Sequence, residues 1–181
     1  MVDLYLDDVR GYWRDLAVPS FDEFWSEFQA DRRIDSGSML VIYRRLISCA
    51  FFLNHLADKA ALMHGMYRGN HLISKIREKD IQSALQLDAC RHFVNDAKHE
   101  MTRLQEASLR ARNSDFDLEG ESMLIQFHML STDGNTLFDM CDVICSVWRF
   151  WISYFDGTAK ISFKDALAYR AGQMSSSPGS C

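Results

Sequence analysis

Apolar residues recur every three to four positions along most of the chain, which is the spacing of an amphipathic α-helix. The polar segments between these runs are short. The pattern predicts helices over residues 3–16, 39–66, 71–79, 80–112 and 139–155, with a further helix just after Pro19 and Ser20. The 39–66 run is apolar on nearly all sides, so we expect that helix to lie at the centre of the fold.

Local signals indicate where the helices begin and end. Pro19 is expected to end the first helix, and Ser20 with Glu23 forms a Ser-x-x-Glu capping box that is expected to begin the second. The polar residues 31–38 are predicted to form a loop, and Asp80 is placed to cap the 80–112 helix. The apolar side of that helix is predicted to consist of Leu87, Cys90, Val94, Ala97, Met101, Leu104 and Ser108.

One stretch departs from the helical pattern. Residues 122–131 mix β-branched, aromatic and long apolar side chains, and the run Thr132-Asp133-Gly134-Asn135 is a strong turn signal. We therefore predict a small β-hairpin near residues 122–138, made of residues 123–130 and 136–138. A short helix over residues 162–169 is expected to follow the 139–155 helix.

Size and composition fit a single folded unit. The chain has 181 residues, 48% of them hydrophobic, which is enough to bury a core. Its two prolines, Pro19 and Pro178, both lie near the ends, so the long stretch between them favours helices. We predict a mainly α-helical bundle of about five larger helices, forming one domain over residues 1–172, with a flexible tail over residues 173–181.

Charge and cysteine content narrow the classes of function. A formal net charge of −5 argues against broad electrostatic binding to nucleic acid. The chain shows no signal-peptide pattern and no uninterrupted apolar run of about 18 residues, so we expect a cytoplasmic protein without a membrane partner. The five cysteines are an odd number and mostly lie in apolar surroundings, which favours reduced core thiols. We expect neither a metal nor another cofactor.

The reactive side chains of the 80–112 helix gather on its polar flank. At 100° per residue, Arg91, Asn95, Lys98 and Thr102 share one stripe of the helix. The adjoining strip holds Asp88, His92 and His99. A guanidinium, an ammonium and two imidazoles on one short surface could hold a phosphate and move protons near it. The alternative interpretation is an ordinary solvent-facing side of an amphipathic helix.

A second polar stripe lies on the apolar 39–66 helix. Arg44, Ser48, His55 and Asp58 are spaced by four, seven and three residues, so they share a face. Polar groups on a largely buried helix need partners, and the polar flank of the 80–112 helix is the simplest one. If the two stripes meet, Asp58 would orient an imidazole. Arg44 or Arg91 would then hold a phosphate oxygen, and His55 or His99 would transfer protons.

A metal site is the rival chemical interpretation of the same flank. His92 and His99 are seven residues apart on one face, and Asp88 or Asp96 lies nearby. The helix contains neither a His-x-x-x-His nor a Glu-x-x-His spacing, and Arg91 would repel a cation. These residues therefore favour metal-independent chemistry.

Arg91-His92, followed by Asn95 and Lys98-His99 on one helix, resembles the active-site helix of the HEPN superfamily. In that family an arginine and a polar residue are followed, a few positions later, by a histidine. Seven residues separate Arg91 from His99 here, where the family usually has four to six. The Asn-Asp-x-Lys-His motif also resembles a group of uncharacterised bacterial helical proteins, a likeness that implies no activity.

The resemblance implies a small helical protein that forms a homodimer and cleaves RNA at the dimer cleft, in bacterial or phage conflict such as a toxin–antitoxin system. In that endoribonuclease Arg91 would bind phosphate, His99 would be the general acid or base, and Asn95 and Lys98 would position the substrate. Supporting residues would be Arg44, His55, Asp58 and His92. The alternative function is a non-catalytic helical module, also homodimeric, whose polar stripe binds a protein partner.

Overall fold

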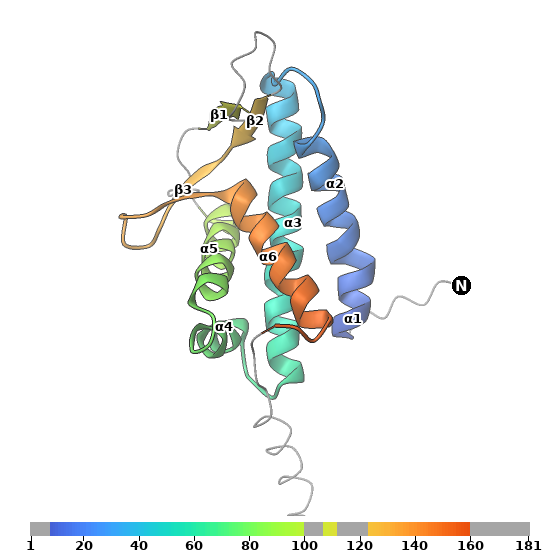
Figure 1. Cartoon of the computed structure of the whole chain (residues 1–181), viewed down its shortest axis with the longest axis vertical. Helices are drawn as coiled ribbons and strands as arrows, with labels where there is room; N and C mark the ends of the chain where they lie inside the picture. The colour runs from blue at the N-terminus through green and yellow to red at the C-terminus, as the bar shows by residue number, and fades with distance from the viewer. Residues whose placement is uncertain (1–7, 100–106, 112–122, 160–181) are drawn as a thin grey trace, which may run out of the picture.

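The computed structural model describes residues 8–99, 107–111 and 123–159. Its first helix begins at Asp8, whose side chain accepts a hydrogen bond from the Gly11 N–H. Helix α1 (Val9–Tyr12) continues through a π-helical segment (Trp13–Ala17) into α2 (Val18–Phe28), so the three form one long helix (Figure 1).

The predicted helix break at Pro19 is therefore wrong. Pro19 lies in the first turn of α2, directly after the π-helical segment, and the chain passes through it without interruption. A proline within a continuous helix removes one backbone hydrogen bond, and the widened π turn before Pro19 leaves room for its ring. The predicted capping box is also wrong, because Ser20 is buried inside the helix.

Helix α3 (Ser36–Met63) begins three residues earlier than predicted. Asp35 is its N-cap: the Asp35 carboxylate accepts from the Ser38 N–H at 2.7 Å, and the Asp35 N–H donates to Ser38 Oγ at 2.8 Å. This reciprocal pair is a capping box in which serine takes the place of the usual glutamate. The loop between α2 and α3 is correspondingly shorter than the predicted 31–38 loop.

Helices α4 (Gly69–Arg77) and α5 (Ile81–Lys98) form the next pair. Asp80 caps α5 as predicted, since its side chain accepts from the Ser83 N–H at 3.0 Å. The predicted continuation of this helix to residue 112 is wrong, because α5 ends at His99 and residues 108–111 form a strand. Met101, Thr102 and Leu104 lie outside the described residues.

The strands form two small antiparallel pairs. The predicted hairpin is confirmed as β3 (His128–Leu130) paired with β4 (Leu137–Asp139), with Gly134 at a φ of 72° in the turn between them. Residues 123–130 are not one strand, however. Strand β2 (Met123–Gln126) ends at Phe127 and pairs with β1 (Ser108–Ala111), a partner that the helical prediction for those residues concealed.

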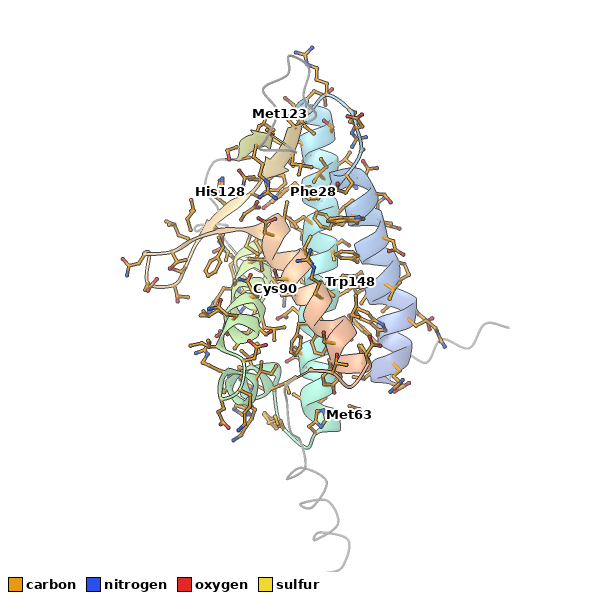
Figure 2. The ribbon with its side chains drawn as sticks, in the orientation of Figure 1. Phe28, Met63, Cys90, Met123, His128 and Trp148 are labelled. Carbon is orange, nitrogen blue, oxygen red and sulfur yellow. The ribbon has the colours of Figure 1, made fainter. Side chains whose placement is uncertain are left out.

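Helix α6 (Met140–Phe155) matches its predicted bounds. Asp139 accepts from the Cys141 N–H at its start, and Gly157 follows its end with a φ of 73°. Trp148 of α6 is labelled in Figure 2. Its ring stacks on two aromatic rings of the first helix, at centroid distances of 4.4 Å from Trp13 and 4.1 Å from Phe21. The predicted 162–169 helix and 173–181 tail lie outside the described residues.

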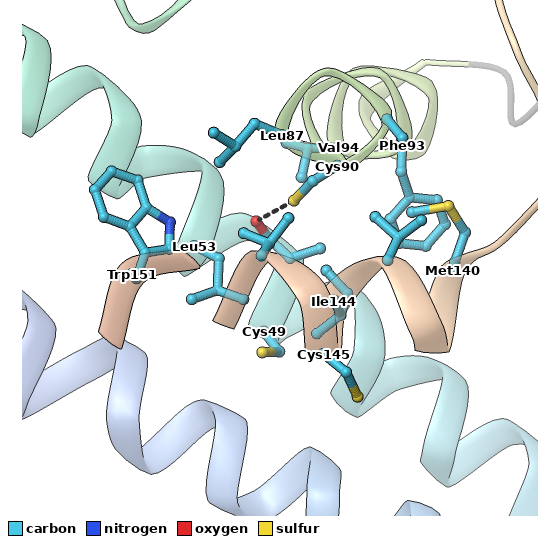
Figure 3. Packing of buried hydrophobic residues seen from close by; sticks show 14 of the residues in the cluster. Cys49, Leu53, Leu87, Cys90, Phe93, Val94, Met140, Ile144, Cys145 and Trp151 are labelled. Carbon is cyan, nitrogen blue, oxygen red and sulfur yellow. Dashed lines mark hydrogen bonds between the residues drawn. The ribbon is translucent and has the colours of Figure 1, made fainter. Parts of the chain in front are cut away.

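The main core lies where α3, α5 and α6 meet. Figure 3 shows Leu53 of α3, Phe93 of α5 and Trp151 of α6 among its buried side chains. Four cysteines are buried free thiols, and burial raises the pKa of Cys90 to about 12. The protein is mainly α-helical, as predicted: across the described residues, five helices (α1–α2 counted as one) carry the predicted hairpin and a second strand pair that was not predicted.

At the C-terminal end of α3, a polar contact joins this helix to α6. His64 Nε2 lies 2.7 Å from the Tyr154 hydroxyl, and both side chains are partly buried. Burial lowers the pKa of His64, because the protonated ring is harder to hold away from water. Burial of His64 therefore favours the neutral imidazole.

Helix α3 is central, as predicted, but one of its sides is open. It packs against α2, α4, α5 and α6, yet only 28% of its most apolar 18-residue window is buried. By length and composition alone it could cross a membrane, a test that the core helices of many soluble proteins also pass. The described bundle therefore leaves part of the apolar surface of α3 uncovered.

Candidate functional site

The polar flank of α5 is held by ion pairs within the chain. Arg91 Nε donates to Asp88 Oδ1 at 3.2 Å, and Arg77 of α4 forms an ion pair with the same carboxylate. Arg91 and Asp88 are partly buried, with 31% and 22% of their side chains exposed. Asp88 thus bridges two guanidiniums and ties α4 to α5.

Arg91 also contacts its neighbour in the sequence. Its Nη2 lies 2.9 Å from His92 Nε2. A guanidinium can only donate, so His92 Nε2 accepts and, in the neutral ring, the proton lies on Nδ1. Arg91 and His92 are therefore brought together, as the sequence suggested, but the arginine is directed at groups of its own chain.

The C-terminal end of α5 carries the candidate residues Lys98 and His99. His99 is the C-cap residue, with its N–H donating to the Asp96 carbonyl at 3.1 Å and its side chain exposed. Eight positions separate it from Arg91, about 12 Å along the helix axis. Arg91 and His99 therefore do not converge within one chain, and Asn95 lies partly exposed between them.

The stripe on α3 divides into residues with different surroundings. His55 packs on the Tyr12 ring at a centroid distance of 5.3 Å. Asp58 accepts from the Gly69 N–H at 2.8 Å, so its carboxylate holds the first residue of α4. This carboxylate therefore stabilises the described fold, whereas Arg44, Ser48 and His55 of the stripe are exposed.

That open surface is a groove of about 760 Å³ along the outward side of α3, which we name the α3 groove. Among the described residues it is lined by Val41, Arg44, Arg45, Ile47, Ser48, Phe51 and Phe52. Lys98 lies beside it, with Nζ 5.2 Å from the centre of the Phe51 ring. Within the described residues, the two predicted stripes approach each other at this point.

Sequence reasoning missed a buried polar residue on the opposite flank of α5. Asp96 is 6% exposed, although the sequence suggested it only as a possible metal ligand. Burial, together with the charge of Asp96, raises the pKa of Tyr43 to about 12. The position of Asp96 around the helix axis is the signal that could have indicated its burial. Asp96 lies 120° from Cys90 of the apolar side, in the direction away from Arg91.

Acidic, thiol and imidazole groups are scattered through the part of the chain that the structure describes. Within it, no three His, Cys, Asp or Glu side chains cluster closely enough to hold a metal ion.

No family model matches the chain, and neither curated proteins nor solved structures give a significant match.

Proposed function

We propose that this protein is a non-catalytic protein-interaction module that binds its partner through the α3 groove. The observation that carries the proposal is the open apolar surface on the long central helix α3. Val41 is exposed, while Ile47, Phe51 and Phe52 are covered only in part by the described bundle. Contiguous apolar surface bordered by polar groups is typical of protein-binding sites.

The geometry of the α5 flank supports a non-catalytic function. General acid–base catalysis needs its groups within hydrogen-bond reach of one substrate. Arg91 contacts Asp88 and His92 of its own chain, and His99 lies about two helical turns away. Within the residues that the structure describes, a single copy therefore offers no assembled acid–base pair around Arg91.

A matched pair of variants tests the interaction function. Phe51→Glu places a carboxylate in the α3 groove, while Ile152→Glu places one at an exposed position of α6 (39% exposed). Tagged full-length wild type and both variants are compared by quantitative pull-down from the source cells and by sedimentation. We expect Phe51→Glu to lose the partner that wild type and Ile152→Glu retain. Identical behaviour of all three proteins would contradict the proposal.

We propose as the second candidate a HEPN-like, metal-independent endoribonuclease completed by a second copy. The observation that favours it is the direct contact of Arg91 with His92, together with the exposed His99 at the end of the same helix. In a dimer, His99 of one copy would act near Arg91 of the other.

The ribonuclease candidate is tested by incubating total RNA with wild type, Arg91→Ala and His99→Ala in the presence of a chelator. Cleavage by wild type alone would support this candidate over the interaction module. Absence of cleavage by a folded wild-type dimer, or equal cleavage by His99→Ala, would exclude His99 chemistry.

A further inference from the structure

The α3 groove has the length of a short helix. Its lining runs from Val41 to Phe52, a stretch of twelve residues of α3 that is about 17 Å long. Val41, Ile47, Phe51 and Phe52 supply apolar and aromatic side chains along that length. Three turns of an amphipathic helix would match it, and helix-in-groove docking uses such apolar anchors at i, i+3, i+4 and i+7.

The border of the α3 groove is basic. Arg44 and Arg45 line it, and Lys98 lies over Phe51 at its side. None of the described lining residues is acidic, although the whole chain has a net charge of −5. Glu23 pairs with Arg45, which leaves Arg44 and Lys98 as the main charges that a bound partner would meet.

We infer that the α3 groove binds an amphipathic helix of another protein whose apolar stripe is flanked by glutamate or aspartate. The inference rests on the proposed interaction function and specifies its partner. Acidic flanks would complement Arg44 and Lys98, while the apolar stripe would cover Phe51. A second copy docked groove to groove would instead bring two basic borders together. RNA, with its charged backbone, would offer the aliphatic lining, such as Val41 and Ile47, little apolar surface to pack against.

The probe is a labelled 16-residue peptide of leucine and glutamate in which the leucines have helical spacing. The control peptide has the same sequence with lysine in place of glutamate. Fluorescence anisotropy with the full-length protein measures both. We expect wild type to bind the Leu/Glu peptide at least tenfold more tightly than the Leu/Lys peptide. The double variant Arg44→Glu/Lys98→Glu is expected to reverse that preference.

Two further variants test the position of the site. Phe51→Glu and Ser48→Glu are each expected to weaken Leu/Glu binding at least tenfold, whereas Ile152→Glu leaves it unchanged. Ser48 is exposed, so Ser48→Glu keeps the test valid if Phe51→Glu fails to fold, which circular dichroism reports.

Equal affinity for the two peptides, or no binding of either, would overturn the acidic-helix inference. Tighter binding of a single-stranded RNA of similar length, lost in Arg44→Glu/Lys98→Glu, would also overturn it. So would a wild-type dimer that Ser48→Glu dissociates, because a second copy would then occupy the α3 groove. If the peptides fail while Phe51→Glu still loses the cellular partner, the interaction function stands and only the acidic helix is wrong.

Discussion

Helices α3 and α5 both carry polar residues beside an apolar stripe, but these polar side chains have different surroundings on the two helices. On α5, Arg91 is engaged by Asp88 and His92, and Asp88 also holds Arg77. On α3, Arg44 borders an open groove with apolar side chains around it. The richer collection of reactive groups is thus the one in which the arginine and the aspartate are paired within the fold. A cluster of catalytic residue types is therefore weaker evidence of a site than apolar surface that the fold leaves open.

The largest expected effect is a difference in the free energy of unfolding between variants of a buried phenylalanine and of a phenylalanine that lines the α3 groove. Phe93 is 1% exposed on the core side of α5, so Phe93→Ala should lower the free energy of unfolding by about 3–5 kcal/mol. Phe51→Ala in the α3 groove should cost only about 1 kcal/mol, because less apolar area leaves contact with the fold. Urea denaturation followed by circular dichroism measures both. Equal losses would mean that the α3 groove is filled in the free protein.

The next effect concerns Asp58, the one polar residue of the α3 stripe that holds another helix. Asp58→Ala leaves the buried Gly69 N–H without its acceptor, which should cost about 1–3 kcal/mol. Asp142→Ala, which removes an exposed ion pair with Arg110, is the control and should cost less than about 1 kcal/mol. If Asp58→Ala were as mild as the control, Asp58 would be available for a functional task.

A pH effect is expected where α3 meets the end of α6. Because burial lowers the pKa of His64, the unfolded chain takes up a proton first as the pH falls through about 6.5. The stability contributed by the neutral ring is therefore full above that pH and is lost as the pH falls toward the lower folded pKa.

The measurement is the free energy of unfolding of wild type and His64→Gln between pH 5 and pH 8. Glutamine can still bond Tyr154 but does not titrate, so the difference isolates His64 from the other histidines. We expect wild type to lose more stability than the variant on acidification, because only the imidazole takes up a proton on unfolding. Parallel curves would show that His64 is not responsible.

The smallest effect concerns the α5 flank itself. Asp88→Asn removes the charge that bridges Arg77 and Arg91, and because these side chains are partly exposed it should cost only about 0.2–1 kcal/mol. Thermal unfolding at low and high salt measures the cost, which should shrink in salt. Asp142→Ala again serves as the reference. A loss above 2 kcal/mol would show that the flank supports the fold.

Local chemistry predicted several elements of the fold, and tertiary context explains the errors. Asp80 caps α5 as its sequence neighbours suggested. The prediction that Pro19 ends the first helix was wrong because the effect of the proline on the helix depends on the preceding π-helical segment. No residue pattern in the sequence predicts that segment. Strand β1 was missed because its pairing with β2 bridges a long sequence separation.

The candidate residues were found, but their surroundings were not predictable. Helical phase correctly placed Arg91 and Arg44 on flanks of their helices. Which neighbours those flanks meet depends on how α4 and α5 pack, so the contact of Asp88 with Arg77 could not be read from spacing. The α3 groove was missed for a related reason: an apolar helix predicts burial, and only the packed bundle shows which side stays open.

The aromatic stack around Trp148 gives the protein a built-in optical reporter. Its indole lies 4.4 Å from that of Trp13, close enough for their excited states to couple and to give a paired signal in the circular dichroism spectrum. Since Trp13 belongs to the π-helical segment and Trp148 to α6, that signal would vanish when the first helix separates from α6. Docking of the first helix can therefore be followed in solution without attaching a dye.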